Sequence, residues 1–548
     1  MLTSSGGKSA APRFSSFPRL FAFVAIGLFV STFLLTGCTG TSSVHQPRPR
    51  RSPSPSQTAA SPSGTAAVGS VSFHANEMTA LRTLKLINYF PAHSSWAYMW
   101  EDFQPAAIGT DMARIAALHA TAVRIIVSVP AFGFPDPRPA DLAELNQVIQ
   151  LAQQQGLRVQ LTLFDSFSDW ADIQGSREWA QAVLGPYAAD PEIAFIELHN
   201  EIDPASPPEM TWTRSLLPYA EKAARGVPVT VSVTGNVSNL ADLRQQLGTA
   251  KPDIWDFHYY GVAAGAYATF AAARAIVSPA LLYIGEFGFS TWPGNAASVP
   301  GLPSSQQDLD IYQAYYYATV EAATKALGLP PAAPWTLNDF SWSGTPPQPS
   351  QAEYFYGLYR LNGSAKPAAA VLSQFFASGR VDTSFNQDFT ELTDPGNGLL
   401  AALWQLQQPG GGTFGSDPST AYAGGGSARL SGTAASCPSY TAAPPNSFAS
   451  PGQSVSVEAY LKGADATGSD GLAVVWMTSS GAPLDYGGHS SAAAFLEDGT
   501  TNWTKLQVTS TAPQGAAYAQ IDLFSCSNTG TVWFSDVHFL PAPAAAGI

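Results

Sequence analysis

From about residue 71 to residue 379, short apolar runs alternate with stretches in which apolar residues recur at helical spacing, as at Leu142, Leu145 and Ile149. The strand candidates between these stretches are Leu84–Phe90, Ala122–Val129, Leu157–Phe164, Ile193–Leu198, Val227–Val233, Ile254–Tyr259, Leu281–Ile284 and Pro334–Leu337. Eight strands that alternate with helices predict an α/β fold, the (β/α)8 TIM barrel. A doubly wound sheet is the alternative, but no Gly-x-Gly-x-x-Gly fingerprint opens a helix after the first strand.

The amino-acid composition of the chain indicates which classes of ligand the protein is expected to bind. The chain has 26 Lys and Arg residues against 40 Asp and Glu residues, a net charge of −14. A nucleic-acid-binding protein needs a positive surface that displaces counterions, so we expect no nucleic-acid partner. Only 12% of the residues are charged, while 11% are aromatic. This balance suits a neutral polar ligand such as a sugar.

The N-terminus has the pattern of an export signal. Basic residues precede an apolar run, Leu20–Leu35, that is short for a membrane span. The run leads into a Leu-Thr-Gly-Cys sequence ending at Cys38, which resembles the lipobox of bacterial lipoproteins. The resemblance implies a signal peptide over residues 1–37 and a lipid on Cys38, with an uncleaved anchor as the alternative. We therefore expect an exported protein, held at the bacterial cell surface by its lipid.

Residues 38–70 are rich in Ser, Pro, Thr and Ala. A segment with so little apolar surface to bury is predicted to be a disordered tether. It would hold the folded domains away from the membrane.

Polar side chains gather where the predicted barrel strands end, which is the end of a (β/α)8 barrel that carries chemistry. Arg124 lies in the second strand, and His258 and Tyr260 lie at the end of the sixth. Glu201 follows the fourth strand and Glu286 the seventh, so their carboxyl groups are expected on opposite sides of one barrel mouth. Cleavage of a glycosidic bond needs two such groups, one protonated and one ionised.

In their order along the chain, these residues resemble the motifs of clan A glycoside hydrolases and, among them, of family 5, the cellulase and mannanase family. The resemblance extends from about Leu84 to Phe376. It implies that Glu201, in the Asn200-Glu201 pair, is the acid/base and that Glu286 is the nucleophile. It also assigns to the substrate site Arg124, Asn200, His258, Tyr260 and Trp335.

Two positions depart from the family pattern. Ile202 stands where a proline usually follows the Asn-Glu pair, and Phe164-Asp165 stands where many members have a histidine after the third strand. These departures concern the subfamily and the substrate more than the two glutamates.

The implied roles predict a definite arrangement. Arg124, His258 and Tyr260 should surround Glu286 and favour its ionised form, because a nearby positive charge or a donated hydrogen bond stabilises a carboxylate. Asn200 should meet the 2-hydroxyl of the sugar. The two carboxyl groups should lie about 5–5.5 Å apart, the spacing that gives retention of configuration.

Aromatic rings that stack on sugars are expected on the loops of the barrel mouth. Trp292 and Trp335 are our candidates for such platforms.

Glu197, four residues before Glu201, points to the same side of its strand by alternation and is interpreted as buried support.

From residue 380 to residue 548 the chain is rich in Gly, Ser, Thr and Ala, with short alternating runs such as 454–460, 472–476, 519–524 and 531–534. This pattern predicts an all-β sandwich, of jelly-roll type. The ends of the segment resemble a carbohydrate-binding module, which implies a possible structural Ca²⁺ near Asp388 and Asp536. Most of its large aromatic residues are expected in the core, but these could bind sugar: Trp404, Trp476, Tyr486 and Trp503.

The chain has three cysteines. With Cys38 assigned to the lipid, Cys437 and Cys526 are left in one region of an exported protein, so we predict a disulfide between them. No Cys/His cluster has the spacing of a zinc site.

Together these patterns favour a retaining β-glycoside hydrolase that acts on a glucan- or mannan-type substrate, without a cofactor and as a monomer. Two alternatives stay open. One is an exo-acting enzyme similar to β-mannosidases or β-galactosidases. The other is a surface protein that binds glycan without turnover.

Overall fold

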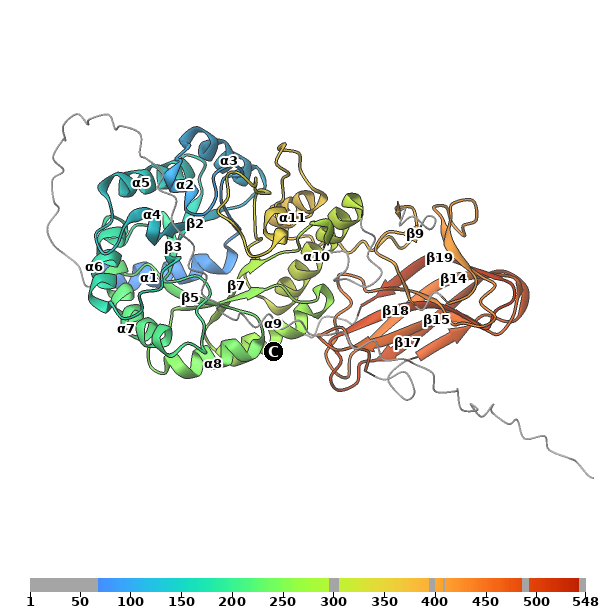
Figure 1. Cartoon of the computed structure of the whole chain (residues 1–548). Helices are drawn as coiled ribbons and strands as arrows, with labels where there is room; N and C mark the ends of the chain where they lie inside the picture. Colours follow the sequence, from blue (N-terminus) through green and yellow to red (C-terminus); the bar gives the residue numbers. More distant parts are fainter. Residues whose placement is uncertain (1–67, 295–304, 394–399, 408–409, 485–491, 542–548) are drawn as a thin grey trace, which may run out of the picture. The chain divides into compact units, whose positions relative to one another are not determined.

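The computed structural model describes residues 68–294, 305–393, 400–407, 410–484 and 492–541 (Figure 1). The expected signal peptide, Cys38 and the tether up to residue 67 lie outside the described residues, as does Tyr486. Within the described ranges, no helix combines the length and the apolarity that crossing a membrane requires.

Seven parallel strands form the first sheet, in the order of the chain from β1 to β7. Nearly all of their residues are buried, because helices cover the outer face and side chains fill the interior. The predicted barrel is thus confirmed. The strands are β1 (Leu86–Asn88), β2 (Ala122–Ser128), β3 (Arg158–Asp165), β4 (Ile193–Glu197), β5 (Val229–Thr234), β6 (Ile254–Tyr259) and β7 (Leu281–Phe287).

The eighth position is occupied by an irregular segment, so the prediction of a strand over Pro334–Leu337 is wrong. Backbone hydrogen bonds still join this segment to both neighbours: Trp335 N–H donates to Phe287 at 2.8 Å, and Asn88 N–H donates to Pro334 at 3.2 Å. Pro334 has no N–H of its own, so it can only accept in this ladder. The segment closes the barrel through one isolated bridge to β7, between Phe287 and Pro334, and through backbone hydrogen bonds to Asn88 of β1.

The helices surround the barrel, as Figure 1 shows. Prolines stand in the first turn of several of them, where the missing N–H costs no hydrogen bond. The helix predicted from Leu142, Leu145 and Ile149 is confirmed as α5. The helices are α1 (Val68–Ala80), α2 (Tyr98–Glu101), α3 (Pro105–Ala117), α4 (Val129–Phe132), α5 (Pro139–Gln153), α6 (Ile173–Leu184), α7 (Pro207–Ala224), α8 (Val237–Leu247), α9 (Ala266–Val277), α10 (Gln306–Leu327) and α11 (Pro367–Ser378).

Two five-stranded antiparallel sheets form the C-terminal domain, with the orders β10-β13-β18-β15-β16 and β11-β12-β19-β14-β17. This confirms the predicted β-sandwich. Its strands are β10 (Gln405–Gln407), β11 (Thr413–Asp417), β12 (Ser427–Ser431), β13 (Ser439–Ala442), β14 (Ser454–Ala466), β15 (Ser469–Met477), β16 (Ala492–Phe495), β17 (Gly499–Thr511), β18 (Tyr518–Cys526) and β19 (Thr531–Leu540). Two short strands, β8 (Leu392–Thr393) and β9 (Leu400–Ala401), pair separately.

The sandwich core accounts for two of the four aromatic residues considered as sugar contacts. Trp476 is fully buried, and Trp404 is 3% exposed, so both are core residues.

The two residues considered for a structural Ca²⁺ have other partners. Asp388 accepts a hydrogen bond from Thr390, and Asp536 lies 3.2 Å from His538. Among the described residues, the clusters of three acidic or histidine side chains that could hold an ion lie in the barrel. Neither Asp388 nor Asp536 belongs to one.

The structure joins Cys437 to Cys526 by a disulfide across 89 positions of the chain. A loop of that length is expected to stabilise the sandwich by about 4 kcal/mol in the chain-entropy description. Replacing both cysteines with serine should therefore lower the denaturant midpoint of the sandwich transition. Mass analysis of the native protein should show no free thiol at either position before reduction and two after it. Free thiols in the native protein would contradict the pairing.

Candidate active site

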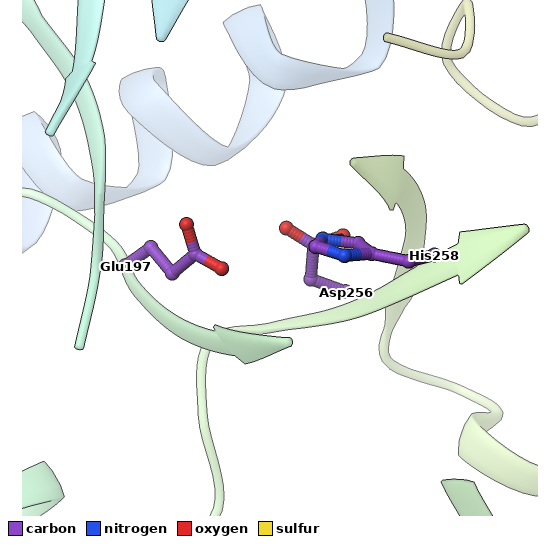
Figure 2. Close-up of side chains that lie close together, drawn as sticks. All are labelled: Glu197, Asp256 and His258. Atoms are coloured by element: carbon purple, nitrogen blue, oxygen red, sulfur yellow. The ribbon is translucent and has the colours of Figure 1, made fainter. Parts of the chain in front are cut away.

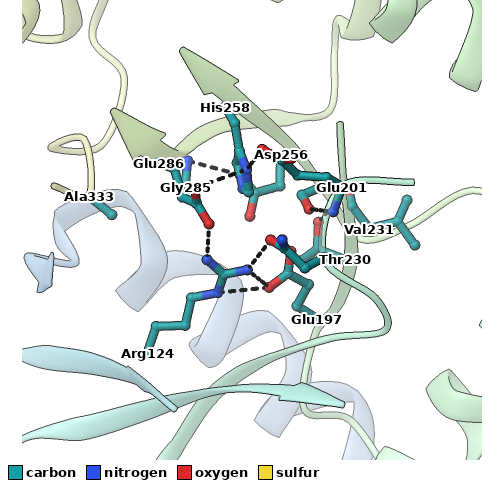
Figure 3. Close-up of polar contacts among 12 residues, drawn as sticks. Arg124, Glu197, Glu201, Thr230, Val231, Asp256, His258, Gly285, Glu286 and Ala333 are labelled. Atoms are coloured by element: carbon teal, nitrogen blue, oxygen red, sulfur yellow. Dashed lines mark hydrogen bonds and ion pairs between the residues drawn. The ribbon is translucent and has the colours of Figure 1, made fainter. Parts of the chain in front are cut away.

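Arg124 organises the centre of the barrel (Figure 3). Its guanidinium is fully buried on β2 and donates to Glu197 on β4, at 2.6 Å from Nη2, and to Glu286 on β7. Burial alone would lower the pKa of Arg124, but the charges of Glu197 and Glu286 raise it, so the group stays cationic. Its other hydrogen bonds go to Asn88, Thr162 and Asn200. Arg124 thus links the strands that carry the predicted site.

Glu286 is held on both carboxylate oxygens. Oε1 accepts from Arg124, and Oε2 accepts from the Tyr260 hydroxyl at 2.7 Å. Its side chain is only 6% exposed. Arg124 and Tyr260 therefore fix the position of both oxygens of Glu286, and the prediction that these two residues surround it agrees with these contacts.

Glu201 lies just after β4 with a φ of +54°, in the left-handed region that non-glycine residues seldom occupy. Its N–H donates to Ser232 Oγ on β5 at 2.7 Å, which supports this turn. The side chain is 30% exposed and is therefore more open to solvent than that of Glu286. A group that protonates an incoming substrate needs this access.

His258, on β6, lies between the two glutamates. Its Nδ1 is 2.8 Å from Glu201 Oε1 and 3.4 Å from Glu286 Oε2. The predicted position of His258 beside Glu286 agrees with the 3.4 Å contact, whereas the shorter contact with Glu201 was not predicted. One carboxylate oxygen of each glutamate and the His258 nitrogen lie within 4.8 Å of one another. The two carboxyl groups therefore face each other across one small space, as a catalytic pair of carboxyls requires.

The charges around His258 decide where its proton lies. Burial alone would lower the pKa of His258, but the negative charges of Glu286, Glu201 and Asp256 raise it to about 9. Burial likewise tends to raise the pKa of Glu201, yet the hydrogen bond and charge of His258 lower it overall. In the free protein the shared proton therefore rests on His258.

Below this pair, Glu197, Asp256 and His258 face one another inside the barrel (Figure 2). All three are fully buried, and one ligand atom from each lies within 4.8 Å of the others. Glu197 accepts from Arg124 and Thr162, so its interpretation as buried support fits these contacts. A guanidinium bonded to Glu197 already supplies positive charge, which disfavours a metal ion in this cluster.

Two further acids were missed by the sequence reasoning. Asp256 lies two residues before His258 on the same strand, so alternation alone could have placed both on one face. Glu353 lies close enough to Trp335 to accept a hydrogen bond, and burial together with the charge of Glu286 raises its pKa to about 7. Nothing in the sequence around Glu353 separates it from an ordinary loop acid.

The two predicted aromatic platforms differ. Trp335 is 7% exposed and meets Phe90 and Trp96 edge-on, so most of its ring is used in packing. Trp292 is half-buried and follows β7 shortly before residues 295–304, which lie outside the described part of the chain.

The amide oxygen of Asn200 accepts from Arg124 at 2.7 Å, which leaves its NH₂ group for a ligand.

No protein-family model matches the chain, and no curated protein matches its sequence. Solved structures do match. A GH5_18 protein from Streptomyces cattleya in complex with Manβ1-4GlcNAc is 18% identical, with 56% of this chain and 84% of that chain covered and a TM-score of 0.45. An exo-β-1,4-mannosidase from Opitutaceae bacterium strain TAV5 is 19% identical, with 54% and 59% covered and a TM-score of 0.44. A structure titled endoglucanase is 15% identical, with 54% and 99% covered and a TM-score of 0.41.

Proposed function

We propose that the chain is a retaining β-glycoside hydrolase that cleaves a glucan- or mannan-type substrate. The observation that carries the proposal is the pair of glutamates at the barrel mouth, whose carboxylate oxygens lie within 4.8 Å of each other with His258 between them. Arg124 and Tyr260 hold the two oxygens of Glu286 in a fixed position at the barrel mouth. The more exposed Glu201 is left to exchange a proton with the substrate.

In the first step, Glu286 attacks the anomeric carbon while Glu201 protonates the departing glycosidic oxygen. A covalent glycosyl–enzyme forms and the aglycone leaves as an alcohol. Glu286 loses its charge in this step, and Arg124 loses one of its two anionic partners. The amide NH₂ of Asn200 can donate to the 2-hydroxyl of the sugar, where a hydrogen bond strengthens in the transition state.

In the second step, Glu201 takes a proton from a water molecule as its oxygen bonds to the anomeric carbon. The bond to Glu286 breaks, and both glutamates return to their starting states. Two inversions at one carbon give net retention.

Hydrolysis of a panel of β-linked polysaccharides and aryl β-glycosides tests the proposal, with proton NMR of the first anomer released. Retained β-product from any member supports it, whereas an α-product from a β-substrate contradicts it. A rapid fall in polymer viscosity identifies endo action. Release of single sugars from aryl mannosides or galactosides identifies the exo alternative, and binding without any product identifies a non-catalytic glycan-binding protein.

The sandwich carries an aromatic group suited to glycan binding, and we propose that it holds the polymeric substrate. Tyr422 is 44% exposed and stacks on Tyr460 with ring centroids 3.5 Å apart, and the half-buried Trp503 meets Tyr422 edge-on at 6.4 Å. Such rings offer flat apolar faces with polar edges.

Replacing Tyr422 and Trp503 together with alanine should weaken retention of the full chain on insoluble polysaccharide by about 10-fold or more, since one exposed and one half-buried ring are lost. Hydrolysis of a small aryl glycoside should stay unchanged. Phe495, 51% exposed on the other sheet, provides the matched control: Phe495→Ala should bind like the parent protein. Equal retention of all three proteins would contradict the role of this group.

A further inference from the structure

The buried triad beneath the catalytic pair contains polar atoms that the mechanism above does not use. Among the residues that the structure describes, no hydrogen-bond partner is found for Glu197 Oε1, Asp256 Oδ2 or His258 Nε2. Leaving a buried polar group unpaired is costly, so three such atoms on side chains of one buried cluster need a reason. Figure 2 shows the two carboxylates directed toward the imidazole.

Asp256 is fixed where it lies. Its Oδ1 accepts from the Gly285 N–H at 2.8 Å and lies 3.9 Å from His258 Nε2. A side chain at position 285 would strike this carboxylate, because a Cβ built there comes within 2.2 Å of Asp256 Oδ1. Gly285 therefore leaves the space that Asp256 fills, directly before the nucleophile Glu286.

We propose that Asp256 is a positioning residue that acts through His258: its buried carboxylate keeps the imidazole protonated and thereby stores the proton that Glu201 delivers to the leaving group. This inference rests on the proposed glycosidase function and deepens it. Asp256 touches neither the substrate nor the reacting atoms.

The proton follows existing contacts. His258 Nδ1 passes it to Glu201 Oε1 along their 2.8 Å hydrogen bond, and Glu201 passes a proton to the glycosidic oxygen as the C–O bond breaks. His258 is then a neutral imidazole and Glu201 a carboxylate. In the second step, Glu201 takes a proton from the attacking water, and the His258–Glu201 pair again holds one proton.

The whole charge environment of His258 favours this storage. Negative groups reach it from β4, β6 and β7, while the positive guanidinium on β2 is bonded to two of them. Burial raises the pKa of Asp256 to about 7, so its charge is present at the alkaline pH values at which the proton would otherwise be lost. The titratable and charged groups that face His258 are Arg124, Glu197, Glu201, Asp256, Tyr260 and Glu286.

The test replaces Asp256 with asparagine, whose amide oxygen can still accept from Gly285 while the charge is removed. A nearby opposite charge raises the pKa of a cation, so removing it should lower the pKa of the His258–Glu201 pair by about 1 pH unit or more. When the substrate is an unactivated oligosaccharide, the alkaline limb of the pH profile of kcat/KM should shift to lower pH by the same amount. With an aryl glycoside whose leaving group needs little protonation, the alkaline limb should move much less.

Asp253→Asn is the matched control. Asp253 precedes the same strand at its other end and likewise accepts from a backbone N–H, that of Val229 at 2.9 Å. Its loss should leave the pH profile in place. A general loss of stability would affect both variants and would not distinguish the two substrates.

An NMR titration of the His258 ring in the full chain, assigned with a His258→Gln variant, measures the same pKa without any substrate. A lower His258 pKa in Asp256→Asn supports the inference, and an unchanged one overturns it. A lowered pKa in a protein that hydrolyses no glycoside would overturn the proposed function and the proton delivery, while the charge effect of Asp256 on His258 would stand.

Discussion

Glu286→Ala is expected to lower turnover by roughly 10⁴-fold or more on every substrate, because no covalent glycosyl–enzyme can form without this carboxylate. The loss should be equally severe with activated aryl glycosides, since leaving-group quality cannot replace a missing nucleophile. The measurement is kcat for an aryl glycoside and for an oligosaccharide, with circular dichroism to show that the barrel is folded.

External azide distinguishes the role of Glu286 from a merely structural one. In Glu286→Ala, azide can occupy the space of the lost carboxylate and attack the sugar once, so the product should be the α-glycosyl azide. Glu178, exposed on α6, is a matched control, and Glu178→Ala should keep the parental rate. Near-normal turnover by Glu286→Ala, or a retained azide product, would show that another group is the nucleophile.

The barrel could be predicted because its strands are buried on both faces and therefore read as largely apolar runs, of which Leu281–Ile284 is an uninterrupted example. The eighth element could not, because an apolar run does not reveal whether its backbone can form a regular ladder. Pro334 removes a donor from that ladder, and only the hydrogen bonds to β7 and β1 show how the barrel closes.

The position of Glu201 and Glu286 at the barrel mouth could be predicted because the order of the chain shows which residues follow each barrel strand. The order of residues along the chain does not show which of two carboxyl groups on facing strands a third side chain contacts. His258 was expected beside Glu286, yet its nearest carboxylate oxygen belongs to Glu201, which a left-handed turn at φ +54° brings toward it.

Buried polar residues were the hardest to interpret from sequence. Within a strand, a carboxylate that points into the barrel has the same spacing as one that points to solvent. The roles of Asp256 and Glu197 can be recognised only when the fold brings β4 and β6 together, which places Glu197, Asp256 and His258 in one buried cluster. The exposed fraction of Trp335 is likewise a property of its neighbours, since its ring packs against Phe90 and Trp96.

Glu201→Ala is expected to separate the two halves of the reaction. Protonation of the leaving group is lost, so kcat/KM for an unactivated oligosaccharide should fall by about 10²–10⁴-fold, the usual contribution of a general acid. An aryl glycoside with a strongly acidic phenol needs little protonation, so its first step should stay close to the parental rate. Its second step should be slow, because no base activates the water, and a burst of phenol should precede a slow steady state.

Azide should restore that second step in Glu201→Ala, since an anion needs no base. It attacks the sugar already bound to Glu286, so the product should be the β-glycosyl azide, the opposite anomer to the one expected from Glu286→Ala. For the residual hydrolysis of the oligosaccharide, the alkaline limb of the pH profile should also vanish, because the proton that His258 and Glu201 share in the parent protein is no longer used. Equal losses on activated and unactivated substrates, or an α-azide, would remove Glu201 from the acid/base role.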